Sequence, residues 1–150
     1  MSQCAGALGA SMVLRFLFPK SATLGETTPA GPALQSFALE MILTALLMFV
    51  ILSVSTGARE KGITAGIAVG AVIALEALFA GPICGASMNP ARSLAPALVS
   101  GRIGDLWIYL VAPVLGGELG VVGCRCVREA GCCSGAEAAE ISPTLDKVTR

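Results

Sequence analysis

The residues with the clearest chemistry are 89–92, which read Asn-Pro-Ala-Arg within an otherwise apolar stretch. Asn is a favoured N-cap and Pro is favoured at the first helical position, so these residues predict a short helix that continues through apolar residues to Val99. The free amides and the macrodipole of such a helix place partial positive charge at its start. That end would repel cations and donate hydrogen bonds to a solute oxygen.

Arg92 is the charged member of this segment. Asn89 and Arg92 are three residues apart, so both side chains lie on one face of the predicted helix. An arginine at membrane depth is costly unless it faces a wet cavity, which makes Arg92 a functional candidate. The alternative interpretation is a surface helix with an ordinary cap. The apolar sequence on both sides favours the membrane interpretation.

The residues before this helix have an unusual composition. Segment 80–90 holds two glycines and two prolines but remains apolar. Irregular backbone is tolerated at membrane depth only where protein buries it or where it lines a water-filled cavity. We therefore expect 80–88 to be irregular and to form, with the helix, a re-entrant loop over residues 80–99.

Composition places these residues in a membrane. Hydrophobic residues make up 55% of the 150 and charged residues 13%, and the mean hydropathy is +0.80. A soluble domain carries about 25% charged residues. Three apolar stretches are long enough to cross a bilayer, which takes roughly 20 residues. They are residues 34–56, 62–80 and 106–124. A shorter apolar piece, 1–18, ends before Pro19 and predicts one further, partial span.

The distribution of Lys and Arg predicts an orientation. One side of the membrane would carry Arg59, Lys61, Arg125 and Arg128, and the other Lys20 and Arg102. The positive-inside rule therefore places the carboxyl terminus in the cytoplasm. Residues 131–150 are polar and show no apolar period, so we expect a disordered cytoplasmic tail after a transmembrane region over 1–130.

Several functional classes are disfavoured. Zero formal net charge and the lack of a basic stripe argue against nucleic acid, which leaves the lipid bilayer and small solutes as partners. The sequence contains no histidine, metal-ligand spacing or phosphate loop, so we expect no enzyme, no catalytic residue, no metal site and no cofactor. Four cysteines, Cys124, Cys126, Cys132 and Cys133, are interpreted as reduced cytoplasmic thiols. The alternative is a metal-binding or lipid-attachment site.

Residues 85–92, which read Gly-Ala-Ser-Met-Asn-Pro-Ala-Arg, resemble the second signature loop of the aquaporin or major intrinsic protein family. The resemblance extends over nearly the whole chain: 3–19 is similar to the end of the family's third helix, and 37–57, 62–79 and 106–123 to the fourth, fifth and sixth. Phe-Ala-Gly-Pro at 79–82 and Leu-Trp-Ile-Tyr at 106–109 resemble bacterial channels and plant nodulin-type intrinsic proteins.

The resemblance implies an all-α membrane protein with an aquaporin-like helical bundle. The chain would supply the second inverted repeat with its re-entrant half-helix, while the amino-terminal half is absent. A gene fragment, a misassigned start or a truncated product would each explain that absence. The implied function is passive transport of water and small uncharged solutes by a homotetramer when full-length. The alternative is a nonconducting fragment that packs with a full-length relative.

The resemblance also implies roles for individual residues. Asn89, Pro90 and Ala91 would form half of the central constriction. The selectivity filter would include Ala77, Ala86 and Arg92. Its small alanines resemble those of channels that pass glycerol, urea or metalloid hydroxides.

Single acidic residues in the three spans need separate explanations. Glu40 resembles the family's buried glutamate in the fourth helix, whose carboxylate accepts hydrogen bonds from the loop. Glu76 and Glu118 depart from the family pattern, and each would be expensive in lipid unless paired or protonated. Cys84 is either a site for mercurial block or a small packed thiol.

Small residues also recur at four-residue intervals in two of the spans. They are Gly62, Gly66 and Gly70 in one, and Ala112, Gly116 and Gly120 in the other. Such faces allow close approach of helix backbones, and we interpret them as packing surfaces.

Overall fold

The computed structural model describes residues 2–55 and 63–127, which form five α-helices and no strand. The helices are α1 (Ser2–Leu17), α2 (Ala33–Ser55), α3 (Ile63–Cys84), α4 (Pro90–Ser100) and α5 (Leu106–Val127). Three of them are long and apolar enough to cross a membrane, over Ala33–Ser55, Thr64–Cys84 and Leu106–Val127. The expectation of three spans is therefore confirmed, and the shorter apolar piece forms the helix α1, whose role as a partial span stays a prediction. The Arg59 turn, Cys132, Cys133 and the tail 131–150 lie outside the described residues.

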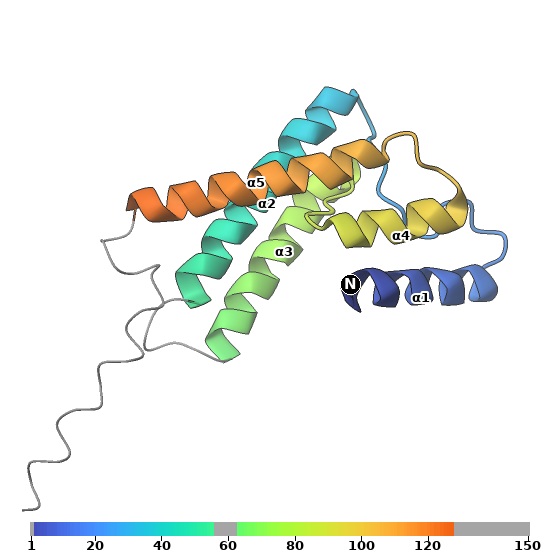
Figure 1. Ribbon diagram of the computed structural model, residues 1–150, viewed down its shortest axis with the longest axis horizontal. Helices are drawn as coiled ribbons and strands as arrows, with labels where there is room; N and C mark the ends of the chain where they lie inside the picture. The colour runs from blue at the N-terminus through green and yellow to red at the C-terminus, as the bar shows by residue number, and fades with distance from the viewer. Residues whose placement is uncertain (1, 56–62, 128–150) are drawn as a thin grey trace, which may run out of the picture.

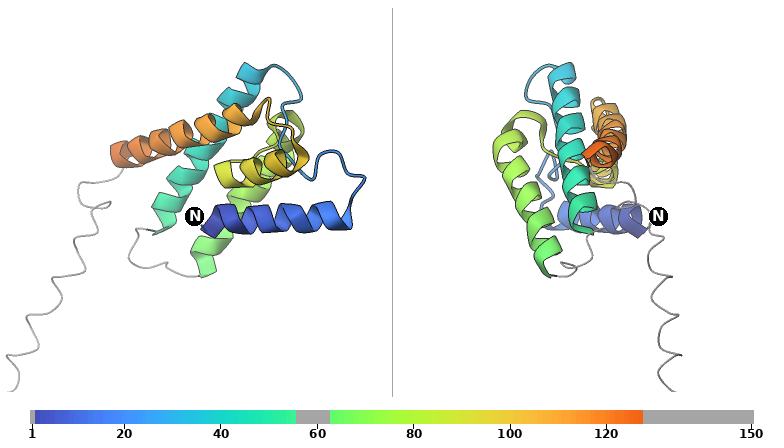
Figure 2. Two further views of the ribbon diagram at one scale, coloured as in Figure 1. Left: turned by 45° about the vertical axis from the view of Figure 1, so that its right-hand side comes forward. Right: turned by 90° about the vertical axis from the view of Figure 1, so that its left-hand side faces the viewer.

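The helices form two packed groups. Figure 1 shows α4 lying alongside α1, while α5 crosses over α2, and α3 lies next to α2. The side view in Figure 2 separates α2 from α3 and shows α5 on the opposite side of α2 from α3. The half-helix α4 is thus positioned by α1 on one side and by α5 on the other.

The small-residue face of α5 explains its close contact with α2. A Cβ atom added to Gly116 would collide with the carbonyl oxygen of Met41, and one added to Gly120 would lie 2.6 Å from the carbonyl oxygen of Ala45. Ala112 is fully buried on the same face. The packing interpretation is therefore confirmed for α5.

The corresponding face of α3 behaves differently. An added Cβ at Gly66 or Gly70 would meet nothing within 4 Å among the described residues, and both glycines are exposed. Gly62 lies outside the described residues. This face of α3 is therefore not packed by any described part of the chain.

One expected boundary is wrong. Residues 80–84 are not irregular, because α3 continues through Pro82 to Cys84, and the break is confined to residues 85–89. Pro82 lacks one backbone donor, but the next turn still forms, with the Gly85 amide donating to the carbonyl of Gly81 at 2.9 Å. The helix ends at Cys84, because the next residue, Gly85, has a left-handed φ of 88°.

A small core lies where this break meets α2 and α3. Its buried members are Leu43, Leu47, Ala80, Cys84, Ala86 and Met88. Much of the remaining apolar surface is exposed, including Phe16 at 84% and Leu78 at 78%. Such a surface fits a chain that is solvated by lipid and by further protein rather than by water.

Candidate functional site

The half-helix α4 begins with the cap that the sequence predicts. Asn89 has extended backbone, with φ −150° and ψ 113°, and its side-chain Oδ1 accepts a hydrogen bond of 2.9 Å from the amide of Ala91. Pro90 occupies the first helical position. Because Oδ1 is engaged with the backbone, the amide group of Asn89 is left to donate hydrogen bonds elsewhere.

An open groove of about 470 Å³ runs between α1 and α4. Three residues of the Asn-Pro-Ala-Arg segment, Asn89, Ala91 and Arg92, line one wall of this groove, together with Pro96. The α1 wall consists mostly of small residues. It is formed by Gln3, Gly6, Ala7, Ala10, Ser11 and Leu14, with Leu24 and Gly25 of the following loop at one end.

Arg92 is an exposed cation in this groove. Within residues 2–55 and 63–127 it forms no ion pair; the single ion pair found there joins Arg102 to Glu26. Its guanidinium group is therefore free to act on whatever occupies the groove. The helix start adds partial positive charge on the same wall.

The two alanines assigned to the filter lie elsewhere. Ala86 is only 5% exposed and belongs to the small core, while Ala77 is exposed on the surface of α3. Neither lines the groove. The described structure thus brings Asn89 and Arg92 together without Ala77 and Ala86, whose filter roles stay predictions.

Glu40 holds the break from the side of α2. Its carboxylate is fully buried and accepts two hydrogen bonds, from the amide of Ser87 to Oε1 at 2.7 Å and from the amide of Met88 to Oε2 at 2.9 Å. These distances confirm the expected position of Glu40 beside the loop amides. Hydrogen bonds to a charged acceptor are roughly twice as strong as neutral ones.

The loop needs this support because its backbone is strained. Ala86 has a φ of 42° and Met88 a φ of 52°, a left-handed region that costs a non-glycine residue about 1–3 kcal/mol. Ser87 lies between them, so the carboxylate of Glu40 binds the loop where its backbone conformation is least favourable. The short bonds to Glu40 therefore hold in place the segment that leads into the half-helix.

Cys84 lies at the end of α3, directly before the loop. Its side chain is fully buried, with Sγ 3.5 Å from the carbonyl oxygen of Ala80, and it does not line the groove. The hydroxyl of Tyr109 on α5 donates a hydrogen bond of 2.7 Å to the carbonyl of Cys84. This environment favours the packed thiol over a site for mercurial block.

The other acidic residues of the spans have no such support. Glu76 is 3% exposed, and neither carboxylate oxygen has a hydrogen-bond partner among the described residues. Glu118 is exposed on α5. The structure provides no pairing for either side chain in residues 2–55 and 63–127.

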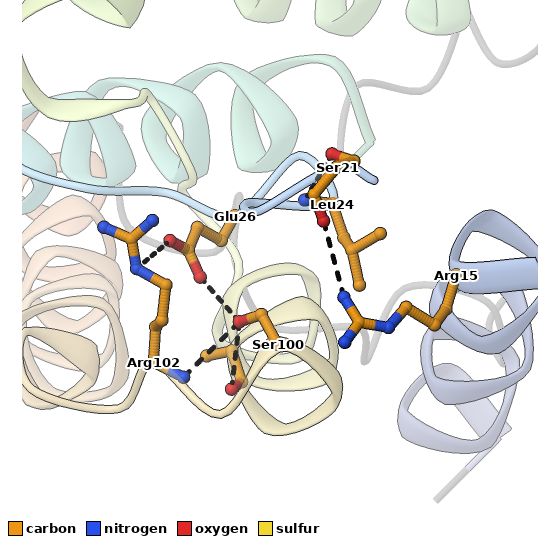
Figure 3. A network of polar contacts seen from close by, with 7 residues as sticks. Arg15, Ser21, Leu24, Glu26, Ser100 and Arg102 are labelled. Atoms are coloured by element: carbon orange, nitrogen blue, oxygen red, sulfur yellow. Dashed lines mark hydrogen bonds and ion pairs between the residues drawn. The ribbon is translucent and has the colours of Figure 1, made fainter. Parts of the chain in front are cut away.

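Sequence reasoning missed the polar contacts of the loop between α1 and α2. As Figure 3 shows, the carboxylate of Glu26 lies 3.0 Å from Nε of Arg102 and accepts a hydrogen bond of 2.8 Å from the hydroxyl of Ser100. Arg15 of α1 reaches back to the carbonyl of Ser21 at 3.4 Å. The contacts of Glu26 tie the loop to the end of α4, that of Arg15 ties it to α1, and nothing in the local sequence pattern indicates them.

The same loop contributes a hydroxyl to the interior. Thr27 hydrogen-bonds to Ser93, which lies 66 residues away in the chain, and Ser93 in turn contacts Ser87. Ser87 and Ser93 stand next to the recognisable segment, but their partner Thr27 has no sequence signal of its own.

Three membrane-spanning helices and a half-helix, capped by Asn89 where a groove passes, define a multi-pass helical membrane protein with an embedded polar site. The family model described as Major intrinsic protein matches residues 1–123. The chain therefore belongs to the major intrinsic protein family.

Relatives of the nodulin-type group support this membership. Aquaporin NIP1-2 of Oryza sativa subsp. japonica is 49% identical over 123 residues, which cover 77% of this chain and 41% of that protein. Aquaporin NIP1-4 of the same plant is 44% identical over 132 residues, or 87% and 48% of the two chains. Aquaporin NIP2-1 of Zea mays is 47% identical over 115 residues, or 77% and 39%. The chain thus spans less than half the length of these relatives.

Proposed function

We propose that this chain supplies one half of a membrane channel that passes water and small uncharged solutes such as glycerol, urea and metalloid hydroxides. The single observation that carries the proposal is the start of α4, where Asn89 and Arg92 line one groove. The proposal places the start of this helix inside the membrane, where its free amides need polar partners such as a passing solute.

The wall chemistry fits neutral polar solutes. The amide of Asn89 and the guanidinium of Arg92 are both donors, so the groove can replace the hydrogen bonds that a hydroxyl or water oxygen loses on leaving bulk solvent. Cations would meet the charge of Arg92 and the positive end of the helix dipole at the same place. Family membership likewise supports a channel rather than an enzyme.

The remaining features of the channel are part of the same proposal. Ala77 and Ala86 would join Arg92 in the filter when the other half of the channel is present, and their small side chains would leave room for solutes larger than water. The completed channel would be a homotetramer in the cell membrane. Its carboxyl terminus would lie in the cytoplasm, because Arg125 lies at one end of the bundle's last span and Arg102 precedes the other end.

Reconstitution tests the proposal. The 150-residue chain alone, whose groove between α1 and α4 is open to its surroundings, should not raise glycerol or water flux in liposomes above protein-free controls. The same chain joined behind the amino-terminal half of Aquaporin NIP1-2 of rice should raise both in stopped-flow light scattering. The rice half alone is the matched control. Absence of flux from the joined protein, once shown to be folded and inserted, would contradict the proposal.

A second candidate is a nonconducting partner of a full-length relative. The open groove and the uncovered Gly66–Gly70 face of α3 favour this reading, since both could be covered by another chain of the family. Co-expression with full-length rice Aquaporin NIP1-2 separates the two candidates. If this chain co-purifies with the full-length relative, and the joined protein gives no flux, the partner role is favoured.

A further inference from the structure

Three buried hydroxyl groups form a continuous chain behind the half-helix. Oγ1 of Thr27 lies 2.6 Å from Oγ of Ser93, which lies 2.5 Å from Oγ of Ser87. Oγ of Ser87 is 2.9 Å from the carbonyl oxygen of Asn89. All three residues are more than nine-tenths buried, with exposed fractions of 8% for Thr27, 1% for Ser93 and 4% for Ser87.

The direction of every hydrogen bond in this chain follows from its last member. The carbonyl of Asn89 can only accept, so Ser87 must use its single hydroxyl proton there. Ser93 must then donate to Ser87, and Thr27 must donate to Ser93. Thr27 therefore donates the first hydrogen bond of the chain, and Ser93 and Ser87 each accept one hydrogen bond and donate one.

Thr27 also packs against the first residue of the break. A Cβ atom built on Gly85 would lie 3.0 Å from both Cβ and Cγ2 of Thr27. Nearby, the amide of Ala30 donates to the carbonyl of Ile83 at 3.0 Å, which fixes this loop to the end of α3. Thr27 thus touches the break at its start, through Gly85, and at its end, through the hydroxyl chain.

The segment that Thr27 holds carries the site. Ser87 follows Ala86, and Ser93 follows Arg92, so a shift in either serine displaces a residue assigned to the filter. Glu40 holds the same segment from α2, because its carboxylate accepts hydrogen bonds from the backbone amides of Ser87 and Met88. Ala86 and Met88 have left-handed backbone, and such conformations persist only where the surroundings over-determine them.

We propose that Thr27 is a positioning residue for the selectivity filter: its hydroxyl, acting through Ser93 and Ser87, fixes the conformation of residues 85–89 and thereby the placement of Asn89 and Arg92 along the groove. The effect of Thr27 on the conformation of the loop does not depend on the proposed channel function. The effect on which solutes pass rests on the proposed channel function.

The loop conformation can be measured on the 150-residue chain in lipid nanodiscs. The buried thiol of Cys84 adjoins the break, so its rate of alkylation by N-ethylmaleimide, followed by mass spectrometry of its own peptide, reports opening of the loop. Thr27→Val keeps the shape and removes the hydroxyl, and it should raise the rate about tenfold, the factor expected for one lost hydrogen bond of ordinary strength. Thr27→Ser should restore the original rate.

Two further variants make the outcome decisive. Thr28→Val is the matched control, because Thr28 is exposed and takes no part in the hydroxyl chain; its rate should not change. Ser93→Ala breaks the same chain from the other side, and its effect should not add to that of Thr27→Val. An unchanged rate in both Thr27→Val and Ser93→Ala, or a rate in Thr27→Ser as high as in Thr27→Val, would overturn the proposal.

Flux through the protein joined to the rice half separates this inference from the channel proposal. Thr27→Val should change the ratio of urea to glycerol permeability by about threefold or more, since selectivity depends on the diameter of a pore and on the donors that line it. Thr27→Ser should leave the ratio unchanged. If the joined protein with Thr27 conducts nothing, the channel proposal fails, while the Cys84 rates still decide the positioning role. If Thr27→Val alters the alkylation rate of Cys84 but not the ratio of urea to glycerol permeability, Thr27 positions the loop without affecting the filter.

Discussion

Two buried glutamates in neighbouring helices have opposite surroundings. Glu40 accepts two short hydrogen bonds from backbone amides, whereas Glu76 has no hydrogen-bond partner among the described residues. A buried carboxylate is stable only where donors replace the water that it loses. The same substitution at the two positions should therefore have opposite effects on stability.

Glu40→Gln should destabilise the protein by about 3 kcal/mol. The glutamine amide would bring an N–H group against one of the amides of Ser87 and Met88, and the remaining bond would lose its charge. Thermal unfolding in detergent measures the change, and hydrogen exchange at Ser87 and Met88 shows whether the loop opens first. A variant as stable as the parent would mean that the carboxylate does not hold the loop.

Glu76→Gln should raise stability by roughly 1–2 kcal/mol, because the ionised form of a buried carboxyl group without a hydrogen-bond partner is costly, and an amide cannot ionise. The assay is the same thermal unfolding, with Glu40→Gln as the control of opposite sign. A loss of stability comparable to that of Glu40→Gln would show that Glu76 has a partner in the assembled protein, outside residues 2–55 and 63–127.

At this scale short spacing in the sequence predicts the cap at Asn89 and the first-turn Pro90, and both are confirmed. The position of Glu40 beside the loop, 47 residues away from Ser87, is also confirmed, but that expectation rests on the family resemblance. The roles of Thr27 and Glu26 could not be predicted, since each depends on a contact across more than 60 residues of chain. A loop sequence carries no information about such partners until the helices around it are placed.

At the scale of helices, packing is controlled by backbone approach rather than by large side chains. The carbonyl groups of Met41 and Ala45 on α2 occupy the space that side chains on Gly116 and Gly120 of α5 would need. In lipid, where burial of apolar surface gives helices little reason to associate, such close packing is a main source of attraction.

Gly116→Ala should therefore destabilise the pair α2–α5 by about 2 kcal/mol or more, because the added methyl group would overlap the carbonyl of Met41. Gly117→Ala is the matched control. Its added Cβ would lie 3.8 Å from the end of the flexible Met48 side chain, so higher helix propensity should make it neutral or slightly stabilising. Equal thermal stability of the two variants would contradict this account of the interface.

Helix positions could be predicted almost completely, because length and apolar runs define spans. The exception is the end of α3. Pro82 and Gly81 predict a break, yet the helix continues to Cys84 and stops only where Gly85 turns left-handed. A single proline removes one hydrogen bond, which surrounding packing can outweigh, whereas a reversal of the chain requires a change of φ.

At the scale of the whole molecule, the groove between α1 and α4 gathers the polar residues of the proposed site. It is open along its length, and its wall is formed by small residues, by Asn89 and by the cation Arg92. Arg92 is the only cation among the described residues that line the groove, so its charge is the part of the proposed ion barrier that a substitution can test.

In the protein joined to the amino-terminal half of rice Aquaporin NIP1-2, Arg92→Ala should increase proton and cation leak while glycerol flux persists. A unit charge about 10 Å from a passing cation, at an effective dielectric constant of about 20, raises the barrier by about 1.7 kcal/mol, so its removal should raise the leak more than tenfold. Arg92→Lys, which keeps the charge, should retain most of the exclusion. A pH-sensitive dye inside liposomes measures the proton leak beside light scattering for glycerol. An unchanged leak in Arg92→Ala would assign the barrier to the amide end of α4 alone.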